Sequence, residues 1–111
     1  MSITGDLIRG HTDAIILARL IQSDSYGYEI NKTISTLSSG RFELKEATLY
    51  TAFKRLEEAG FITSYWGDSG AGARRRYYAI TPAGRDACHR LKAEWEETKE
   101  IMDKLLIMED R

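Results

Sequence analysis

The residues around 46–80 constrain the fold of this chain more than any other segment. The first part carries apolar side chains at the spacing of one helix face, and this pattern stops at Gly60. The face consists of Leu49, Ala52, Phe53 and Leu56. Two segments rich in β-branched and aromatic residues follow, 61–66 and 74–80, joined by the glycine-rich stretch 67–73. A helix over about 45–59 and then a β-hairpin are therefore predicted.

Shorter signals predict the other elements. Thr12 is expected to cap a helix that runs to about Gln22. Ser23–Ser25 then caps a second helix, which ends in Ser38–Gly40 and leads to a short strand or extended turn over 41–44. A threonine followed by proline, Thr81-Pro82, begins a last helix that continues to about Met108. Helices followed by a hairpin with three arginines are typical of a winged helix-turn-helix.

The predicted fold is thus mainly α with a small β-hairpin, an α+β winged helix-turn-helix with a long C-terminal helix. We expect residues 1–80 to form a DNA-binding domain and residues 81–111 to form a dimerisation helix. The length of 111 residues suits one compact domain with one peripheral helix.

Composition narrows the classes of protein. No apolar run is long enough to span a membrane, and the first residues have no signal-peptide core, so a cytoplasmic location and no membrane partner are expected. The single cysteine, Cys88, excludes an internal disulfide framework. The net charge is −1, but residues 41–80 hold seven basic and five acidic side chains. A locally positive surface is what binding to phosphate requires.

Several apparent sites lack the geometry for their chemistry. Gly70-Ala-Gly72 lies between strands, with no helix to receive a phosphate. Cys88 and His89 are adjacent on a helix and point in different directions, which makes a poor metal pair. Glu57 and Glu58 fit solvated helix positions. The sequence therefore predicts no metal, no cofactor and no enzymatic activity.

The candidates for DNA contact lie on the helix over 45–59 and on the hairpin. Thr51 and Lys54 fall opposite the apolar face, and Thr48, Tyr50 and Arg55 fall on its flanks. The three arginines Arg74, Arg75 and Arg76 begin the second strand, where Arg74 and Arg76 share one face. The alternatives are a solvated helix face and arginines that pair with Asp68, Glu57 or Glu58.

The last helix carries a mostly apolar seam at alternating spacings of three and four. It consists of Cys88, Leu91, Trp95, Thr98, Met102 and Leu105, widened by Ile101, Leu106 and Met108. We expect a homodimer whose interface includes Leu91, Trp95, Thr98, Met102 and Leu105. The alternative is a helix that folds back onto its own core. Trp95 is a candidate effector site that stacks a small planar aromatic molecule, or simply an anchor of the dimer.

With these pieces in order, the chain resembles the PadR family of bacterial transcriptional regulators, and its short-tailed subgroup in particular. The matching segments are LIRGHTDAIILARL (7–20), DSYGYEI (24–30), FELKEATLYTAFKRLEEAGFITSYWG (42–67) and RRRYYAITPAGR (74–85). The resemblance implies a winged-helix domain, a dimer formed by the C-terminal helix, and a repressor that releases double-stranded DNA when a small molecule or stress signal arrives.

The resemblance also implies roles for particular residues. Thr48, Tyr50 and the following residue correspond to the family's TLYP-like DNA-contacting segment, although Thr51 replaces the proline of many members. Lys54 and Arg55 match the basic pair that follows, and Arg74–Arg76 match the basic wing. Trp95 matches no family motif. An inverted-repeat operator follows from the dimer, and the alternative function is a winged-helix protein-interaction module that does not bind DNA.

Overall fold

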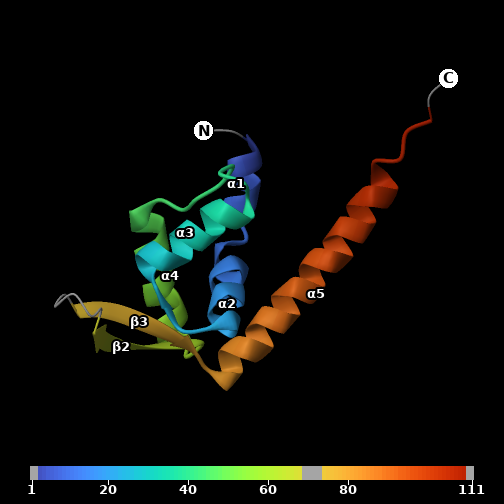
Figure 1. Cartoon of the computed structure of the whole chain (residues 1–111). Coiled ribbons are helices and arrows are strands. Elements are labelled where there is room, and N and C mark those ends of the chain that lie inside the picture. Colours follow the sequence, from blue (N-terminus) through green and yellow to red (C-terminus); the bar gives the residue numbers. More distant parts are fainter. Residues whose placement is uncertain (1–2, 69–73, 110–111) are drawn as a thin grey trace.

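The computed structural model describes residues 3–68 and 74–109, and apart from α1 and β1 the helices and strands of this part follow the predicted order (Figure 1). The fold is mainly helical with a small antiparallel sheet, as predicted. Its elements are α1 (Ile3–Arg9), α2 (Thr12–Gln22), β1 (Ser25–Tyr26), α3 (Gly27–Leu37), α4 (Glu46–Glu58), β2 (Ile62–Asp68), β3 (Arg74–Ile80) and α5 (Pro82–Leu105).

The hydrophobic core forms where α2, α3 and α4 meet the sheet. Because apolar residues recur every three or four positions on each helix, each presents one continuous face to the others. Phe53 of α4 stacks on Tyr78 of β3 with ring centroids 3.9 Å apart, which fixes α4 against the sheet. The largest fully buried side chains are Phe53, Ile16, Leu17, Leu20, Ile30, Leu44, Leu56 and Ile62. This packing is that of a winged helix-turn-helix.

The sheet has the order β1-β3-β2, with β3 in the centre. In the hairpin formed by β2 and β3, which we call the wing, Trp66 pairs with Arg76 and Gly67 with Arg75. On the other side of β3, Tyr26 pairs with Tyr77. Residues 69–73, which include most of the predicted hairpin loop with Gly70 and Gly72, lie outside the described residues.

The N-terminal region differs from the prediction. Helix α1 was not expected, and Thr12 does not cap α2, because the N-cap position belongs to His11. Thr12 lies in the first turn instead, where its hydroxyl donates a hydrogen bond to the carbonyl oxygen of Arg9 at 2.6 Å. The threonine therefore closes the turn between α1 and α2 rather than satisfying the N–H groups of α2.

The predicted cap Ser23–Ser25 is also wrong. Ser25 and Tyr26 form the short strand β1, and α3 begins at Gly27 without a side-chain cap. The Ser25 hydroxyl donates to Glu29, and the carboxylate of Asp24 accepts a hydrogen bond from Tyr65 in β2. The polar segment thus ties the sheet to α3.

A short strand or an extended turn was predicted here. Residues 42–45 form no strand, so the extended turn is the correct alternative. Asn31 of α3 holds this segment at Leu44, where its side chain accepts a hydrogen bond from the backbone N–H at 2.8 Å and donates one to the carbonyl at 2.7 Å. Helix α4 follows and ends before Gly60, whose φ of +80° is the left-handed conformation that glycine adopts readily.

Helix α5 begins as predicted, because the hydroxyl of Thr81 accepts a hydrogen bond from the backbone N–H of Gly84. The first turns pack against α2, burying Ala87 and Cys88, while the later part extends away from the other helices (Figure 1). The helix ends at Leu105 rather than near Met108. No helix among the described residues is long and apolar enough to cross a membrane.

Candidate nucleic-acid interface

Helix α4 presents the predicted contact residues on the side opposite its buried face. Thr51, Lys54 and Arg55 are exposed, Thr48 is half-buried, and Tyr50 keeps 45% of its surface exposed. The residues predicted to face inward, Leu49, Ala52, Phe53 and Leu56, are all buried. The helical period therefore predicted the orientation of α4 correctly.

Tyr50 does not project freely from α4. Its ring meets Phe53 edge-on, with centroids 5.5 Å apart, and its hydroxyl lies against the first residue of α3, Gly27. A Cβ atom at Gly27 would stand 2.6 Å from the Tyr50 hydroxyl, so this close approach requires glycine. The contact fixes the end of the ring, and 45% of the Tyr50 surface remains exposed.

Arg55 forms an ion pair with Asp13 in the first turn of α2. The Nε atom of Arg55 lies 3.4 Å from one carboxylate oxygen, and Nη2 donates to the other. The side-chain hydrogen bond that Arg55 donates to Asp13 is the largest cause of the raised pKa of Arg55. Both side chains remain partly exposed, at 53% for Arg55 and 38% for Asp13.

The wing arginines have unequal surroundings. Arg76 donates a hydrogen bond to the Ser64 hydroxyl at 2.8 Å and lies 3.7 Å from a carboxylate oxygen of Glu57 on α4. The Ser64 hydroxyl in turn donates to Glu57 at 2.7 Å. The alternative in which a wing arginine pairs with Glu57 therefore holds for Arg76, which joins the base of the wing to α4.

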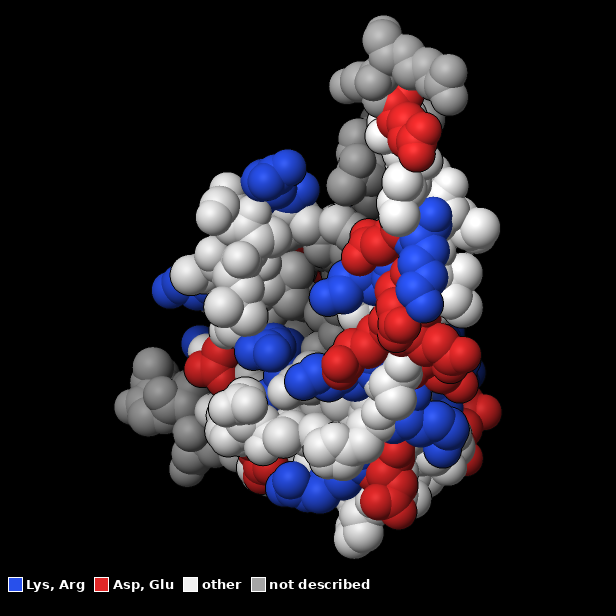
Figure 2. All heavy atoms as spheres, turned by 90° about the vertical axis from the view of Figure 1, so that its right-hand side faces the viewer, with Lys and Arg blue, Asp and Glu red and all other residues white. Residues whose placement is uncertain are grey.

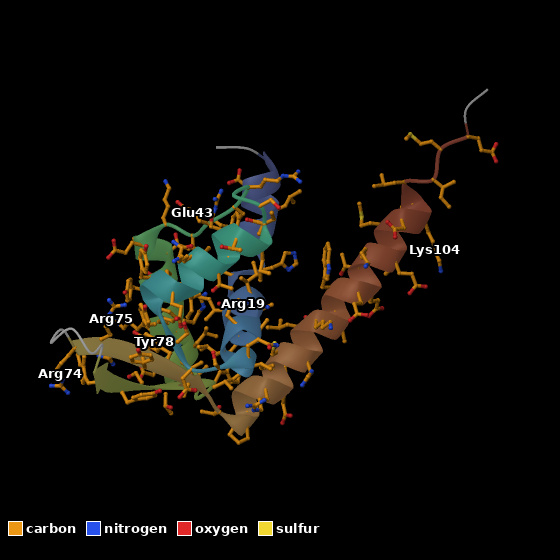
Figure 3. The ribbon with its side chains drawn as sticks, viewed as in Figure 1. Arg19, Glu43, Arg74, Arg75, Tyr78 and Lys104 are labelled. Atoms are coloured by element: carbon orange, nitrogen blue, oxygen red, sulfur yellow. The ribbon has the colours of Figure 1, made fainter. Side chains whose placement is uncertain are left out.

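The other two arginines contact aromatic rings. The guanidinium of Arg75 lies 4.5 Å from the ring centre of Tyr26, and that of Arg74 lies 5.5 Å from Trp66. Figure 3 shows Arg74 pointing away at the outer end of the hairpin, with Arg75 on the side towards the helices. Arg74 is exposed and Arg75 half-buried, so Arg74 is the more accessible positive charge.

Two depressions on either side of α4 are lined by the predicted residues except Lys54. The first, of about 610 Å³, lies between α4, the start of α3 and the wing, and we call it the wing groove. The second, of about 390 Å³, lies between α4 and the turn from α1 to α2, and we call it the rim depression. The wing groove is lined by Tyr26, Gly27, Tyr28, Tyr50, Trp66, Arg74, Arg75 and Arg76, and the rim depression by Arg9, Thr12, Ala47, Thr48, Thr51 and Arg55.

Some lining residues were missed from the sequence. Tyr26, Tyr28 and Trp66 surround the arginines of the wing groove, and Arg9 reaches the rim depression from α1. The position of Trp66 beside Arg76 follows from the hairpin register. A hairpin register centred on position 71 pairs these two residues, so the sequence could have predicted this contact. Arg9 had no such signal, because α1 was not recognised.

The predicted seam on α5 is buried only at its start. Leu91 packs partly against the core, and the ring of Trp95 meets His11 edge-on with centroids 5.2 Å apart. Trp95 still exposes 46% of its surface, Met102 45% and Leu105 72%, while the Thr98 hydroxyl donates to the carbonyl of Glu94. The first turns of α5 therefore complete the chain's own core, and no other described residues bury the apolar side chains from Trp95 onward to a comparable degree.

The face of α5 turned away from the helices carries acidic and basic side chains side by side (Figure 2). One pair, Lys104 and Glu100, lies within one turn at 3.3 Å. This face is unlike the apolar seam, so α5 is amphipathic along its projecting part. Among the described residues, no group of three or more His, Cys, Asp or Glu side chains is placed to hold a metal ion.

Comparisons with known proteins show similarity in sequence and in fold. The family model described as the transcriptional regulator PadR-like family matches residues 16–90. A transcriptional regulator of Clostridium thermocellum is 46% identical, with a TM-score of 0.86 over 96% of this chain and 100% of the other. A PadR family regulator of Clostridium difficile is 38% identical, with a TM-score of 0.76 over 87% of this chain and 99% of the other. An uncharacterised protein of Lysinibacillus sphaericus is 47% identical over 91% of this chain and 93% of its own length.

Proposed function

Because the chain belongs to the PadR-like family of transcriptional regulators, we propose that it is a homodimeric repressor that binds double-stranded DNA at an inverted-repeat operator. The observation that carries this proposal is the arrangement of α4 between the wing groove and the rim depression. Hydroxyl and guanidinium groups border α4 on both sides, and these groups donate hydrogen bonds to bases and phosphates.

Within this proposal, α4 enters the major groove and the wing lies over the neighbouring backbone or minor groove. Thr48, Thr51 and Lys54 face the bases, and Tyr50 and Arg55 lie beside them. Among the wing arginines, Arg74 makes the principal contact because it is exposed at the outer end. Arg75 and Arg76 extend less far towards the DNA, since Arg75 lies over the Tyr26 ring and Arg76 is paired with Glu57.

The proposed dimer forms through residues 81–111, with residues 1–80 as the DNA-binding part. The exposed apolar side chains of α5 support this division, because a second copy of the same helix offers a matching apolar face. The interface contains Trp95, Thr98, Met102 and Leu105, with Leu91 at its edge. Two copies of α4 then meet successive major grooves about one turn apart, ~34 Å.

Release from DNA is proposed to follow binding of a small planar aromatic molecule at Trp95. Half of the indole is accessible, and the other part contacts His11, which directly precedes α2. A ligand stacked on Trp95 therefore lies next to the turn that positions the recognition part of the domain. A ligand that binds more tightly to the arrangement of this turn that does not bind DNA shifts the protein population towards that arrangement.

The test is to sequence the DNA fragments that the purified protein retains from its own genome at moderate salt. We expect enrichment of fragments that share an inverted repeat. Replacing Arg74, Arg75 and Arg76 together by alanine should weaken binding to these fragments and lower the salt slope by ~0.9 for each phosphate that the wing no longer neutralises. A matched control replaces Lys92, Lys99 and Lys104 on α5 by alanine, which changes the net charge equally.

The control variant should keep most of the affinity and the slope. Equal losses in both variants would show that only overall charge matters, and the assignment to the wing would be wrong. Retention of no DNA by the folded wild-type protein would instead support the protein-interaction module.

A further inference from the structure

The ion pair between Arg55 and Asp13 lies at the border of the proposed DNA interface. Arg55 lines the rim depression together with Thr48 and Thr51, the residues expected to face the bases. A smaller depression of about 250 Å³ adjoins it and is lined by both members of the pair. The Arg55 guanidinium therefore lies at the proposed interface and is also paired with the carboxylate of Asp13.

Arg9 is a lining residue of both depressions as well. Its own partner is Asp6, one turn earlier on α1. Thr12 lines the rim depression together with both arginines and lies in the first turn of α2, where the helix dipole is positive. Two arginines, each paired with a nearby carboxylate, thus line the same two depressions at the start of α2.

The pair is not needed to join α2 to α4. Buried side chains of both helices, including Leu17, Leu20 and Phe53, already pack in the common core. Ion pairs exposed to this degree contribute little to stability, because solvent screens them. The position of Asp13 is therefore better explained by what Arg55 does at the surface.

We propose that Asp13 occupies the place of a DNA phosphate in the free protein, and that Arg9 and Arg55 form a phosphodiester-binding site once the carboxylate is displaced. The inference rests on the proposed DNA-binding function. A guanidinium binds a carboxylate or a phosphate through the same pair of parallel hydrogen bonds, so one acceptor replaces the other.

The exchange affects specificity. Any DNA backbone that takes Arg55 must first separate it from Asp13, and this requirement weakens all backbone binding. An operator that also satisfies Thr48, Thr51 and the wing arginines offsets this cost through its further interactions. Asp13 therefore lowers non-specific binding more than it limits operator binding.

The test measures DNA binding by fluorescence anisotropy, with the most enriched genomic fragment and with an unrelated duplex of equal length, at several salt concentrations. Asp13→Asn keeps the shape of the side chain and removes its charge. We expect roughly three- to tenfold tighter binding to the unrelated duplex and a smaller gain on the enriched fragment. Arg55→Gln should weaken both and lower the salt slope by ~0.9, and Arg9→Gln should act in the same direction.

The double variant Asp13→Asn, Arg55→Gln separates the mechanism from a general charge effect. If Asp13 acts through Arg55, the double variant should bind like Arg55→Gln alone. The matched control is Asp24→Asn, which removes the same charge from a carboxylate bonded to Tyr65 in the sheet. Circular dichroism of every variant ensures that folded proteins are compared.

Three results would overturn the inference: no gain from Asp13→Asn in the folded protein, the same gain from Asp24→Asn, or a gain that persists in the double variant. If any of these results is obtained while the wild type binds its enriched fragment, the proposed function is retained and the proposed role of Asp13 is wrong. If the wild type binds no DNA, both fall.

Free phosphate is a second source of the same ligand chemistry. Inorganic phosphate, titrated at constant ionic strength and followed through the Arg55 Nε–H resonance, should produce no shift at concentrations where DNA saturates the protein. A saturable shift with phosphate at those concentrations would assign the site to a free anion and contradict its assignment to DNA.

Discussion

The exposed end of α5 gives a quantitative prediction for the dimer. Replacing Leu105 by alanine removes about three methylene-sized groups, which contribute ~2.4 kcal/mol on full burial. Leu105 exposes 72% of its surface in the single chain, so ~1.7 kcal/mol of this remains to be gained from a partner. A two-fold dimer contains the residue twice, and the free energy of dimerisation should fall by ~3.5 kcal/mol, roughly a 300-fold rise in Kd.

Sedimentation equilibrium over a range of protein concentrations measures this constant directly. Alanine preserves helix propensity, so α5 itself should stay intact. Lys104→Ala is the matched control in the same turn, because its exposed pair with Glu100 contributes less than ~1 kcal/mol. An unchanged Kd for Leu105→Ala would refute the assignment of the dimer interface to the projecting part of α5.

Three further predictions concern the folded chain. Gly84→Ala should lower the free energy of unfolding in urea by ~3 kcal/mol, because the new Cβ would stand 2.1 Å from the carbonyl oxygen of Phe61; a stability equal to wild type would show that the start of α5 can shift freely. Asn31→Ala should cost ~1–3 kcal/mol in the same assay, since it leaves the backbone N–H and carbonyl of Leu44 without the amide. Burial raises the pKa of the Cys88 thiol, so the folded state favours the protonated thiol. The contribution of this thiol to the free energy of unfolding is therefore fully present below the ordinary thiol pKa and is lost as pH rises through the raised pKa. Cys88→Ala should therefore show a shallower loss of stability than wild type between about pH 8 and pH 10; parallel curves would contradict this.

The elements predicted well from sequence are those with strong local signals. The three- and four-residue spacing of apolar side chains specified α4 and its buried face, and Gly60 marked its end. The wing followed from two β-rich segments around a glycine-rich turn. Thr81 and Pro82 specified the start of α5, because capping and the preset φ of proline act within one turn.

The elements that were missed depend on distant partners. Strand β1 has only two residues and exists because Tyr26 pairs with Tyr77, some fifty positions later. Nothing local distinguishes its sequence from the start of a helix. Helix α1 has seven residues including a glycine, too few for a periodic signal. The end of α5 was placed too late because the apolar run continues past Leu105 without a glycine or proline.

The candidate site shows the same division. Helical period and strand alternation placed Thr51, Lys54 and Arg74 on accessible faces. Neither rule reveals ion pairs between elements. The pair of Arg55 with Asp13 therefore became visible only in the folded chain, and Glu57 was one of three alternative partners for the wing arginines until the fold assigned it to Arg76. The ion pair with Glu57 distinguishes Arg76 from Arg74, and the contact with the Tyr26 ring distinguishes Arg75 from it.

The most direct test of the central claim is a hydroxyl-radical footprint on the most enriched genomic fragment. Two copies of α4 and the wing should protect two patches related by two-fold symmetry and separated by about one helical turn, ~10 base pairs. Arg74→Ala should remove protection beside each patch and leave their centres in place. A folded wild-type protein that protects no region of the fragment, or one patch without a symmetric partner, would contradict the account.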